Sequence, residues 1–381
     1  MFHFRRALLG SLAPLPLLLI SPPHALAEGR VLFQAKRGIA QTAFFHAHGG
    51  TTLTGLTVRR LRVAGSPVTE ARRIRMLPGV AWAEPEGLIH ALKLDPLQSS
   101  QWALGAIHAE QGWALAGLTR VPELIGVPIG IVDTGVDTKH EDLKGRIAAC
   151  AASTAGRVKT GVCEDGDGHG THVAGIAAAG TGNGVGIAGV AGASPLIICR
   201  ALSGKGSGST GDVAACIAWV AAQGAKVVNL SLGGPDSHAL HTAIQTAARS
   251  GAVIVAAAGN SGPSEVSWPA AYPEVISVAA SDPNGHRADF SNTNRDVELT
   301  APGTNILSCK AHGGYVRMSG TSMAAPMISG AAALVWSILS RPTPASVRAA
   351  LDHSARDVGT RGRDASYGFG LFDFALTGQS G

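Results

Sequence analysis

Charged residues are scarce in this 381-residue chain, at 15%, whereas apolar residues make up 45%. A disordered chain would show the opposite balance, because it lacks the apolar side chains that form a core. Glycine is abundant, at 50 residues, but it follows no three-residue period, which excludes a collagen-like helix. The composition therefore indicates a turn-rich globular protein with one large or two modest domains.

Long hydrophobic runs are also missing. Beyond the first residues, no segment of about 18 apolar residues is free of glycine and polar breaks, so we expect no stable membrane span. The apolar run 7–20 follows Arg5 and Arg6, contains two prolines and precedes Ala25-Leu-Ala27, as in a secretory signal peptide. We expect residues 1–27 to be cleaved after Ala27 and the protein to be secreted, extracellular or periplasmic; an uncleaved anchor is the alternative.

The chain also lacks an excess of negative charge. Its net charge is +5, which raises the question of whether it binds nucleic acid. The positive charge is concentrated in residues 1–93, which hold 12 Lys and Arg against 4 Asp and Glu. Residues 94–381 hold 19 Lys and Arg against 22 Asp and Glu, so the larger part of the chain is slightly acidic. We therefore expect no nucleic-acid partner.

Cysteine is infrequent, and the five cysteines cannot all pair within one chain. Export makes disulfides feasible. Cys150 and Cys163 flank a polar stretch and could close a short loop, while Cys199 lies in a strand-like run and Cys216 in the next helix-like run. We predict these two pairs and a free Cys309; buried unpaired thiols remain the alternative for any of them.

The pattern along the chain changes near Asp95. Residues 28–93 resemble a small α+β unit, with strand-like apolar stretches and one helix-like stretch. Downstream, residues 94–381 alternate continuous apolar, β-branched runs with alanine-rich helical stretches. Continuous apolar strands are typical of a parallel sheet covered on both faces. We predict an α/β fold with a doubly wound, mostly parallel sheet and helices on both faces.

Three glycine-flanked segments carry residues suited to catalysis. Asp133 directly follows the apolar run 127–132, His169 precedes an apolar helix, and Ser322 precedes the helix-like run 327–339. Taken singly, they could be a turn residue, a helix-entry hydrogen bonder and a helix cap. Together, they supply the hydroxyl, the base and the orienting carboxylate that nucleophilic acyl transfer needs.

At this point the chain resembles the subtilisin-like serine proteases, the subtilases, over about residues 95–375. The matching motifs are Val132-Asp133-Thr-Gly, His169-Gly-Thr-His172-Val-Ala-Gly, Ser231-Leu-Gly-Gly, Ala257-Ala-Gly-Asn260 and Gly320-Thr-Ser322-Met-Ala-Ala-Pro326. The resemblance implies that Ser322 is the nucleophile, that His169 is the general base and that Asp133 orients the imidazole. It also implies that the Asn260 amide completes the oxyanion hole.

The resemblance further implies how substrate is held, and it suggests a broad specificity. Two backbone edges would pair with an extended peptide, and small residues would line the first specificity pocket. The edge residues are Ser231, Leu232 and Gly233 on one side and Gly206, Ser207 and Gly208 on the other. The expected pocket residues are Ala257, Ala258 and Gly259.

By the same resemblance, a structural calcium could bind in a loop that is one residue longer and richer in glycine than usual. Its expected ligands are Gln98, Asp142, Asn183 and the carbonyls of Val185 and Ile187, because calcium prefers oxygen. A glycine-rich loop without an ion is the alternative. No cofactor is expected for catalysis.

Two other motifs are not expected to bind ligands. The dinucleotide-like pattern Gly184-Val-Gly-Ile-Ala-Gly189 follows a helix instead of a strand and is typical of a loop. His172 is expected to pack in a helix rather than bind zinc.

Residues 28–93 resemble the inhibitory propeptide of this family, which would lie across the active site until it is removed. We therefore expect an autoprocessed zymogen that acts on proteins or peptides as a monomer. Two alternatives are a catalytically silent peptide-binding protein on the same fold and a lipase or esterase. The second would require G-x-S-x-G and the order Ser, Asp, His, which this chain lacks.

Overall fold

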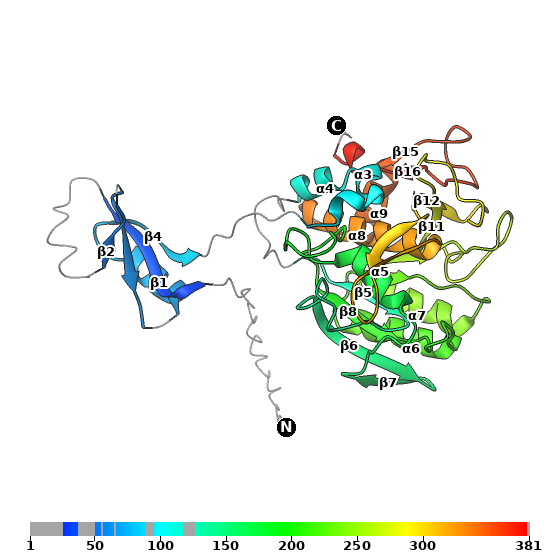
Figure 1. The fold of residues 1–381 in the computed structure, drawn as a ribbon, viewed down its shortest axis with the longest axis horizontal. Helices are drawn as coiled ribbons and strands as arrows, with labels where there is room; N and C mark the ends of the chain where they lie inside the picture. The colour runs from blue at the N-terminus through cyan, green and yellow to red at the C-terminus, as the bar shows by residue number, and fades with distance from the viewer. Residues whose placement is uncertain are drawn as a thin grey trace, which may run out of the picture. The chain divides into compact units, whose positions relative to one another are not determined.

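The structure, a computed structural model, describes residues 26–36, 50–54, 56–64, 66–87, 95–116 and 126–378. It divides into two compact units, Met1–Ala91 and Leu92–Gly381 (Figure 1). The predicted junction between residues 93 and 94 and the predicted signal peptide up to residue 25 lie outside the described residues. Leu26 and Ala27 are the first residues of strand β1.

The first unit is an antiparallel sheet with one helix. The strands lie in the order β2-β3-β1-β4, and α2 packs against β1 and β4. Val31, Phe33 and Ile74 form its small core. The bounds are β1 Leu26–Ala35, β2 Thr51–Thr52, β3 Val58–Arg62, α2 Pro67–Arg75 and β4 Val80–Gly87.

The second unit is built on a sheet of ten strands in the order β15-β16-β12-β11-β10-β9-β5-β8-β6-β7, from top to bottom in Figure 1. All neighbouring pairs are parallel except β15–β16 and β6–β7 at the two edges. The strands are β5 Ile129–Asp133, β6 Ile147–Thr154, β7 Arg157–Thr160, β8 Leu196–Arg200, β9 Val227–Leu230, β10 Val253–Ala257, β11 Val275–Ser281, β12 Val297–Pro302, β15 Ala355–Arg356 and β16 Leu371–Phe372. A separate hairpin joins β13 Ile306–Cys309 to β14 Tyr315–Met318.

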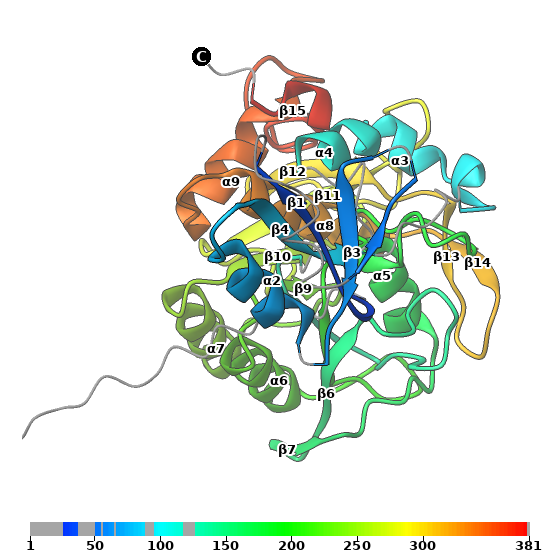
Figure 2. The ribbon, with the colours of Figure 1, turned by 90° about the vertical axis from the view of Figure 1, so that its left-hand side faces the viewer.

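Helices cover both faces of this sheet, as the sequence predicts. Along β8, Leu196 and Ile198 belong to one core cluster, whereas Ile197 and Cys199 belong to another. The first cluster contains α5 and α8, and the second contains α6 and α7, which lie side by side (Figure 2). The helices are η1 Gln98–Ser100, α3 Trp102–Ala106, α4 Ala109–Leu115, α5 His169–Ala178, α6 Thr210–Ala222, α7 His238–Arg249, α8 Thr321–Ile338, α9 Pro344–His353 and η2 Phe374–Leu376.

Within the described residues, α8 is the one helix long and apolar enough to cross a membrane. Most of it is buried against strands β9, β10, β11 and β12, as expected for the central helix of a globular core. Its apolar composition is therefore explained by packing within the second unit.

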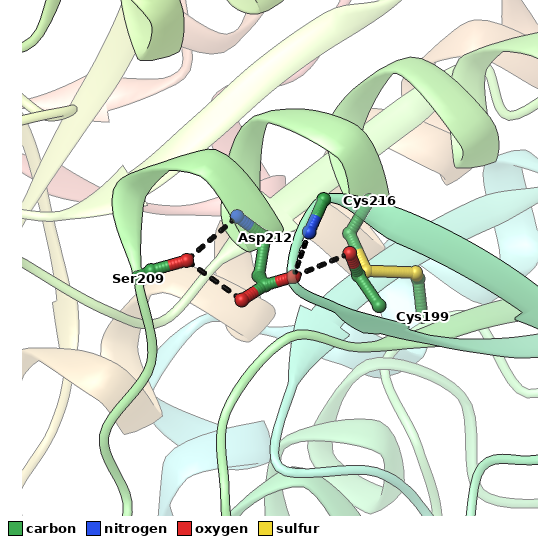
Figure 3. Close-up of a disulfide and its surroundings, with 6 residues drawn as sticks. Cys199, Ser209, Asp212 and Cys216 are labelled. Carbon is green, nitrogen blue, oxygen red and sulfur yellow. Dashed lines mark hydrogen bonds between the residues drawn. A yellow bond between two sulfur atoms is a disulfide. The ribbon is translucent and has the colours of Figure 1, made fainter.

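The two predicted disulfides are present, Cys150–Cys163 and Cys199–Cys216, and Cys309 is buried and unpaired. Figure 3 shows the second disulfide, which joins β8 to α6. Beside it, Asp212 accepts hydrogen bonds from Ser209 Oγ and Ser153 Oγ, at 2.6 and 2.7 Å, and so ties the start of α6 to β6.

Asp352, near the end of α9, is a partly buried carboxylate beside Glu298. Burial and the neighbouring Glu298 carboxylate raise its pKa from 3.8 to about 7, and one of its oxygens has no hydrogen-bond partner. The folded protein therefore holds a proton that the unfolded chain releases. Stability that is present below about pH 4 is lost as pH rises toward 7.

We expect Asp352→Asn to stabilise the protein at pH 9 by about 1 kcal/mol after allowance for solvent screening, and by less at pH 5. The asparagine amide can still donate to Glu298 but carries no charge. The measurement is the melting temperature at both pH values. An equal rise in melting temperature at both pH values would contradict the raised pKa of Asp352.

Candidate active site

The sheet brings the predicted site residues together at one edge. Parallel strands present their carboxyl ends on the same side, and ligands bind there in open α/β sheets. Strand β5 ends at Asp133, β9 ends just before Ser231, and β10 ends three residues before Asn260. Helices α5 and α8 begin at the same edge with His169 and the Thr321-Ser322 pair.

Asp133 and His169 are hydrogen-bonded. His169 Nδ1 lies 2.7 Å from Asp133 Oδ1, and the Asp133 side chain is fully buried. An ionised carboxylate can only accept a hydrogen bond, so Nδ1 of the neutral imidazole carries its proton. Nε2 is then free to accept a proton from another group. The Asp133 charge raises the pKa of His169 from 6.5 to about 9 against the opposing effect of burial, and Asp167 and Asp165 add to the rise.

Ser322 lies in the first turn of α8, in a cleft of about 400 Å³ that His169 also lines. Its Oγ donates to the Ser231 carbonyl at 3.3 Å, and within the described residues no hydrogen bond joins it to His169. Catalytic hydrogen bonds are often long before substrate binds, so the shared cleft is the relevant observation. The helix N-terminus favours negative charge beside Ser322.

Asn260 lies next to the nucleophile and is oriented by Thr321. Its Oδ1 accepts hydrogen bonds from Thr321 N and Thr321 Oγ1, both at 2.9 Å. These bonds direct the opposite atom, Nδ2, away from Thr321. Asn260 and Ser322 line the same pocket of about 360 Å³, so the amide is placed to donate to a group bound there.

Both predicted substrate edges line the cleft with His169 and Ser322. The lining includes Gly206, Ser207 and Gly208 on one side and Ser231, Leu232 and Gly233 on the other. Gly208 must lack a side chain, because a Cβ there would lie 2.2 Å from the Ala201 carbonyl oxygen.

One predicted pocket residue is wrong. Ala257 and Gly259 line the pocket beside Asn260, but Ala258 does not. It is buried with Ala279 and Val297 on the other side of the extended segment, because successive residues of an extended chain point in opposite directions.

Two further polar residues, Asn292 and Asp165, hold the site in place and are not among the residues predicted from the sequence. Asn292 accepts from Ser261 N and donates to the Ala258 carbonyl, at 2.7 and 2.9 Å, so it fixes the turn that carries Asn260. Asp165 bonds to the segments around Asp133 and His169. The only sequence signal for Asp165 was its place in an acidic, glycine-rich stretch just before the histidine.

His172 is a packing residue, as predicted. It is completely buried, and Nε2 lies 3.1 Å from the carbonyl oxygens of Ile306 and Val316. Burial lowers its pKa to about 4, so the ring is neutral. Within the described residues, no group of three His, Cys, Asp or Glu side chains could hold a metal.

Two of the residues predicted to bind calcium, Asn183 and Ile187, hydrogen-bond to the buried carboxylate of Asp142, a third. Asn183 Nδ2 donates to Asp142 Oδ1 at 2.9 Å, and Ile187 N and Tyr315 Oη donate to Oδ2 at 2.8 and 2.9 Å. Leu97 N bonds to the Gly186 carbonyl, which brings the segment of Gln98 to this loop. A buried carboxylate suits an oxygen-seeking ion, but both Asp142 oxygens accept hydrogen bonds, and the Asn183 amide would have to turn over to present its oxygen.

The second unit is similar to known proteins over most of its length. Residues 125–370 match the model of the subtilase family. The chain is 40% identical to subtilisin DY of Bacillus licheniformis over 258 residues, 66% of this chain and 91% of that protein. It is 39% identical to thermitase of Thermoactinomyces vulgaris over 270 residues, 70% of this chain and 93% of that protein.

The chain belongs to the subtilase family. A solved structure, S41 psychrophilic protease, superimposes with a TM-score of 0.63 at 34% identity and covers 72% of this chain and 98% of its own. This subtilase is a subtilisin-like serine endopeptidase, and its substrates are proteins. The related subtilisins and the two disulfides indicate an extracellular protein.

Because the general base must be neutral, kcat/KM should rise with pH through the pKa of His169, about 9. We expect Asp167→Asn to move this midpoint down by a few tenths of a unit, and less at high salt, because an exposed charge is screened. The measurement is kcat/KM against pH for a peptide substrate.

Asp296→Asn is the matched control. Asp296 directly precedes β12, so it lies at the amino-terminal ends of the parallel strands, away from the site. Removing its charge should leave the pH midpoint of kcat/KM unchanged. Equal shifts in the two variants, or a wild-type midpoint near 6.5, would contradict the raised pKa.

Proposed function

We propose that this subtilase is exported as a zymogen and matures by its own proteolytic activity into an endopeptidase of broad specificity. The observation that carries the proposal is the hydrogen bond from His169 to the buried Asp133, because His169 lines the same cleft as Ser322. These are the three groups that acyl transfer requires.

In the proposed reaction, Ser322 Oγ attacks the carbonyl carbon of the scissile bond while His169 Nε2 takes its proton. Asp133 holds the tautomer with the proton on Nδ1 and stabilises the imidazolium. The oxygen that becomes negative accepts hydrogen bonds from Asn260 Nδ2 and the Ser322 backbone N–H. The imidazolium then protonates the leaving amine, and water hydrolyses the acyl-enzyme by the same steps.

Broad specificity follows from how the peptide would be held. The edges at Gly206–Gly208 and Ser231–Gly233 offer backbone N–H and C=O groups, and such pairing tolerates many side chains. The pocket beside Asn260 is lined by small residues, Ala257 and Gly259 among them, and has a volume of about 360 Å³. That space admits a sizeable side chain.

Residues 28–93 would act as an intramolecular inhibitor, with the tail near residues 87–92 lying in the cleft like a product. The separate core of this unit and its excess of positive charge support the proposal, because the remainder of the chain is acidic. The mature enzyme would be a monomer. Cleavage after Ala27 during export would precede the removal of this unit.

A structural calcium would be held by Gln98, Asp142, Asn183 and the carbonyls of Val185 and Ile187. The ion would neutralise the buried Asp142 carboxylate and fix the glycine-rich loop. It would take no part in catalysis, for which no cofactor is needed.

We expect Ser322→Ala to abolish proteolysis and to leave a precursor that has lost only its signal peptide. The measurements are intact mass and casein hydrolysis. Ser337→Ala is the control, because this serine lies near the far end of α8 and, within the part of the chain that the structure describes, its side chain bonds only to the Leu334 carbonyl of the same helix. Normal maturation of Ser322→Ala would show that another protease removes the propeptide, and retained hydrolysis would reject Ser322 as nucleophile.

We expect chelation to lower the melting temperature of the inhibited enzyme by several degrees, since an ion bound only by the folded state stabilises it. Calcium, but not magnesium, should restore the lost stability, and Asp142→Asn should abolish the response. A melting temperature that does not change on chelation would show that the hydrogen bonds to Asp142 suffice without an ion.

A further inference from the structure

Asp165 is a buried carboxylate that touches neither substrate pocket. Its side chain is 6% exposed, and it lies four residues before His169, between β7 and α5. Its Oδ1 accepts hydrogen bonds from Thr134 Oγ1, Gly168 N and Asp167 N, at 2.8, 2.8 and 3.1 Å. Its Oδ2 accepts from Thr171 N and Thr171 Oγ1, at 2.8 and 2.6 Å.

The two threonines belong to the two elements that carry the catalytic pair. Thr134 directly follows Asp133 at the end of β5, and Thr171 lies in the first turn of α5, two residues after His169. Each hydroxyl donates to Asp165, so its lone pairs remain for another donor.

The threonine hydroxyls also accept from the opposite element. Thr134 Oγ1 accepts from Gly170 N on α5 at 2.8 Å, and Thr171 Oγ1 accepts from Asp137 N after β5 at 2.9 Å. The result is a closed, reciprocal network that crosslinks the end of β5 to the start of α5. Asp165 lies at the centre of this network and accepts five hydrogen bonds, and only a carboxylate side chain can accept all five.

We propose that Asp165 is a positioning residue that sets the distance between Asp133 and His169 through Thr134 and Thr171. This inference rests on the proposed function, because it assigns a role in the reaction of Ser322. Burial opposes the ionisation of Asp165, but the hydrogen bonds from Thr171, Gly168 and Asp167 outweigh it and lower the pKa. The group is therefore ionised over the whole working range, and its charge contributes to the raised pKa of His169.

An asparagine at this position has the same shape, but its NH₂ group cannot accept. In Asp165→Asn, one of the two threonines must therefore lose its partner and face another donor. We expect kcat to fall at least tenfold while KM changes less than threefold, because neither pocket is altered. The pH midpoint of kcat/KM should also fall, since a negative charge near His169 is lost.

A purely structural role would not move the hydrogen bond between the catalytic groups. The low-field proton NMR signal of His169 Nδ1–H reports on this bond directly, and we expect it to shift or broaden in Asp165→Asn. Asp364→Asn is the matched control. Asp364 likewise accepts several hydrogen bonds, from Thr360 N, Ser366 N and Tyr367 N, but it lies between β15 and β16, and within the described residues no hydrogen bond joins it to Asp133 or His169. It should lower the melting temperature and leave kcat within twofold and the NMR signal unchanged.

A second pair of variants keeps the proposal falsifiable if Asp165→Asn does not fold. Thr171→Ser keeps the hydroxyl and should retain kcat, whereas Thr171→Val keeps the shape, removes the hydroxyl and should reduce kcat. All variants are matured with a trace of active enzyme and normalised by titration with a covalent serine inhibitor.

Equal kcat for Thr171→Ser and Thr171→Val, or an unchanged kcat and NMR signal in Asp165→Asn, would overturn the inference. These outcomes require an active wild type that the inhibitor labels. A wild type with neither activity nor label would instead reject the proposed function.

Discussion

The active site depends on the parallel arrangement of the central strands. Strands β5, β9 and β10 run in the same direction, so the residues at their carboxyl ends meet at one edge of the sheet. This places Asp133, Ser231 and Asn260 near one another although they are far apart in the sequence. Helix α8 packs across the same strands and begins at that edge, which sets Ser322 beside them.

Crosslinks hold the loops that the sheet itself does not fix. The substrate edge at Gly206–Gly208 is exposed, as it must be if its backbone is to pair with a peptide. It lies between Cys199 on β8 and Cys216 on α6, so the disulfide closes a loop around it. Ser209, directly after it, caps α6 and bonds to Asp212, so this exposed stretch of backbone is anchored where it enters the helix.

The sequence predicted the sheet, the helices on both faces and the disulfide pairs, because continuous apolar runs and local spacing report these features. It also placed the catalytic residues in one site, because their motifs are specific. It could not place Ala258, whose direction depends on where β10 ends, or Asn292, whose partners lie more than thirty residues away. The Asp165 network could not be read either, since it depends on which of several polar residues the fold brings together.

The negative charges around His169 have opposite effects on the two stages of the proposed reaction. Asp133 and Asp165 are both buried, and both would stabilise the imidazolium that forms when His169 takes the Ser322 proton. The same charges raise the pKa of the resting imidazole, so a smaller fraction of His169 is neutral at pH 7. Catalysis gains only where an interaction is stronger in the transition state than in the ground state. At alkaline pH the resting His169 is neutral, while the neighbouring carboxylates still stabilise the imidazolium in the transition state. The acidic residues around the histidine therefore favour activity at high pH.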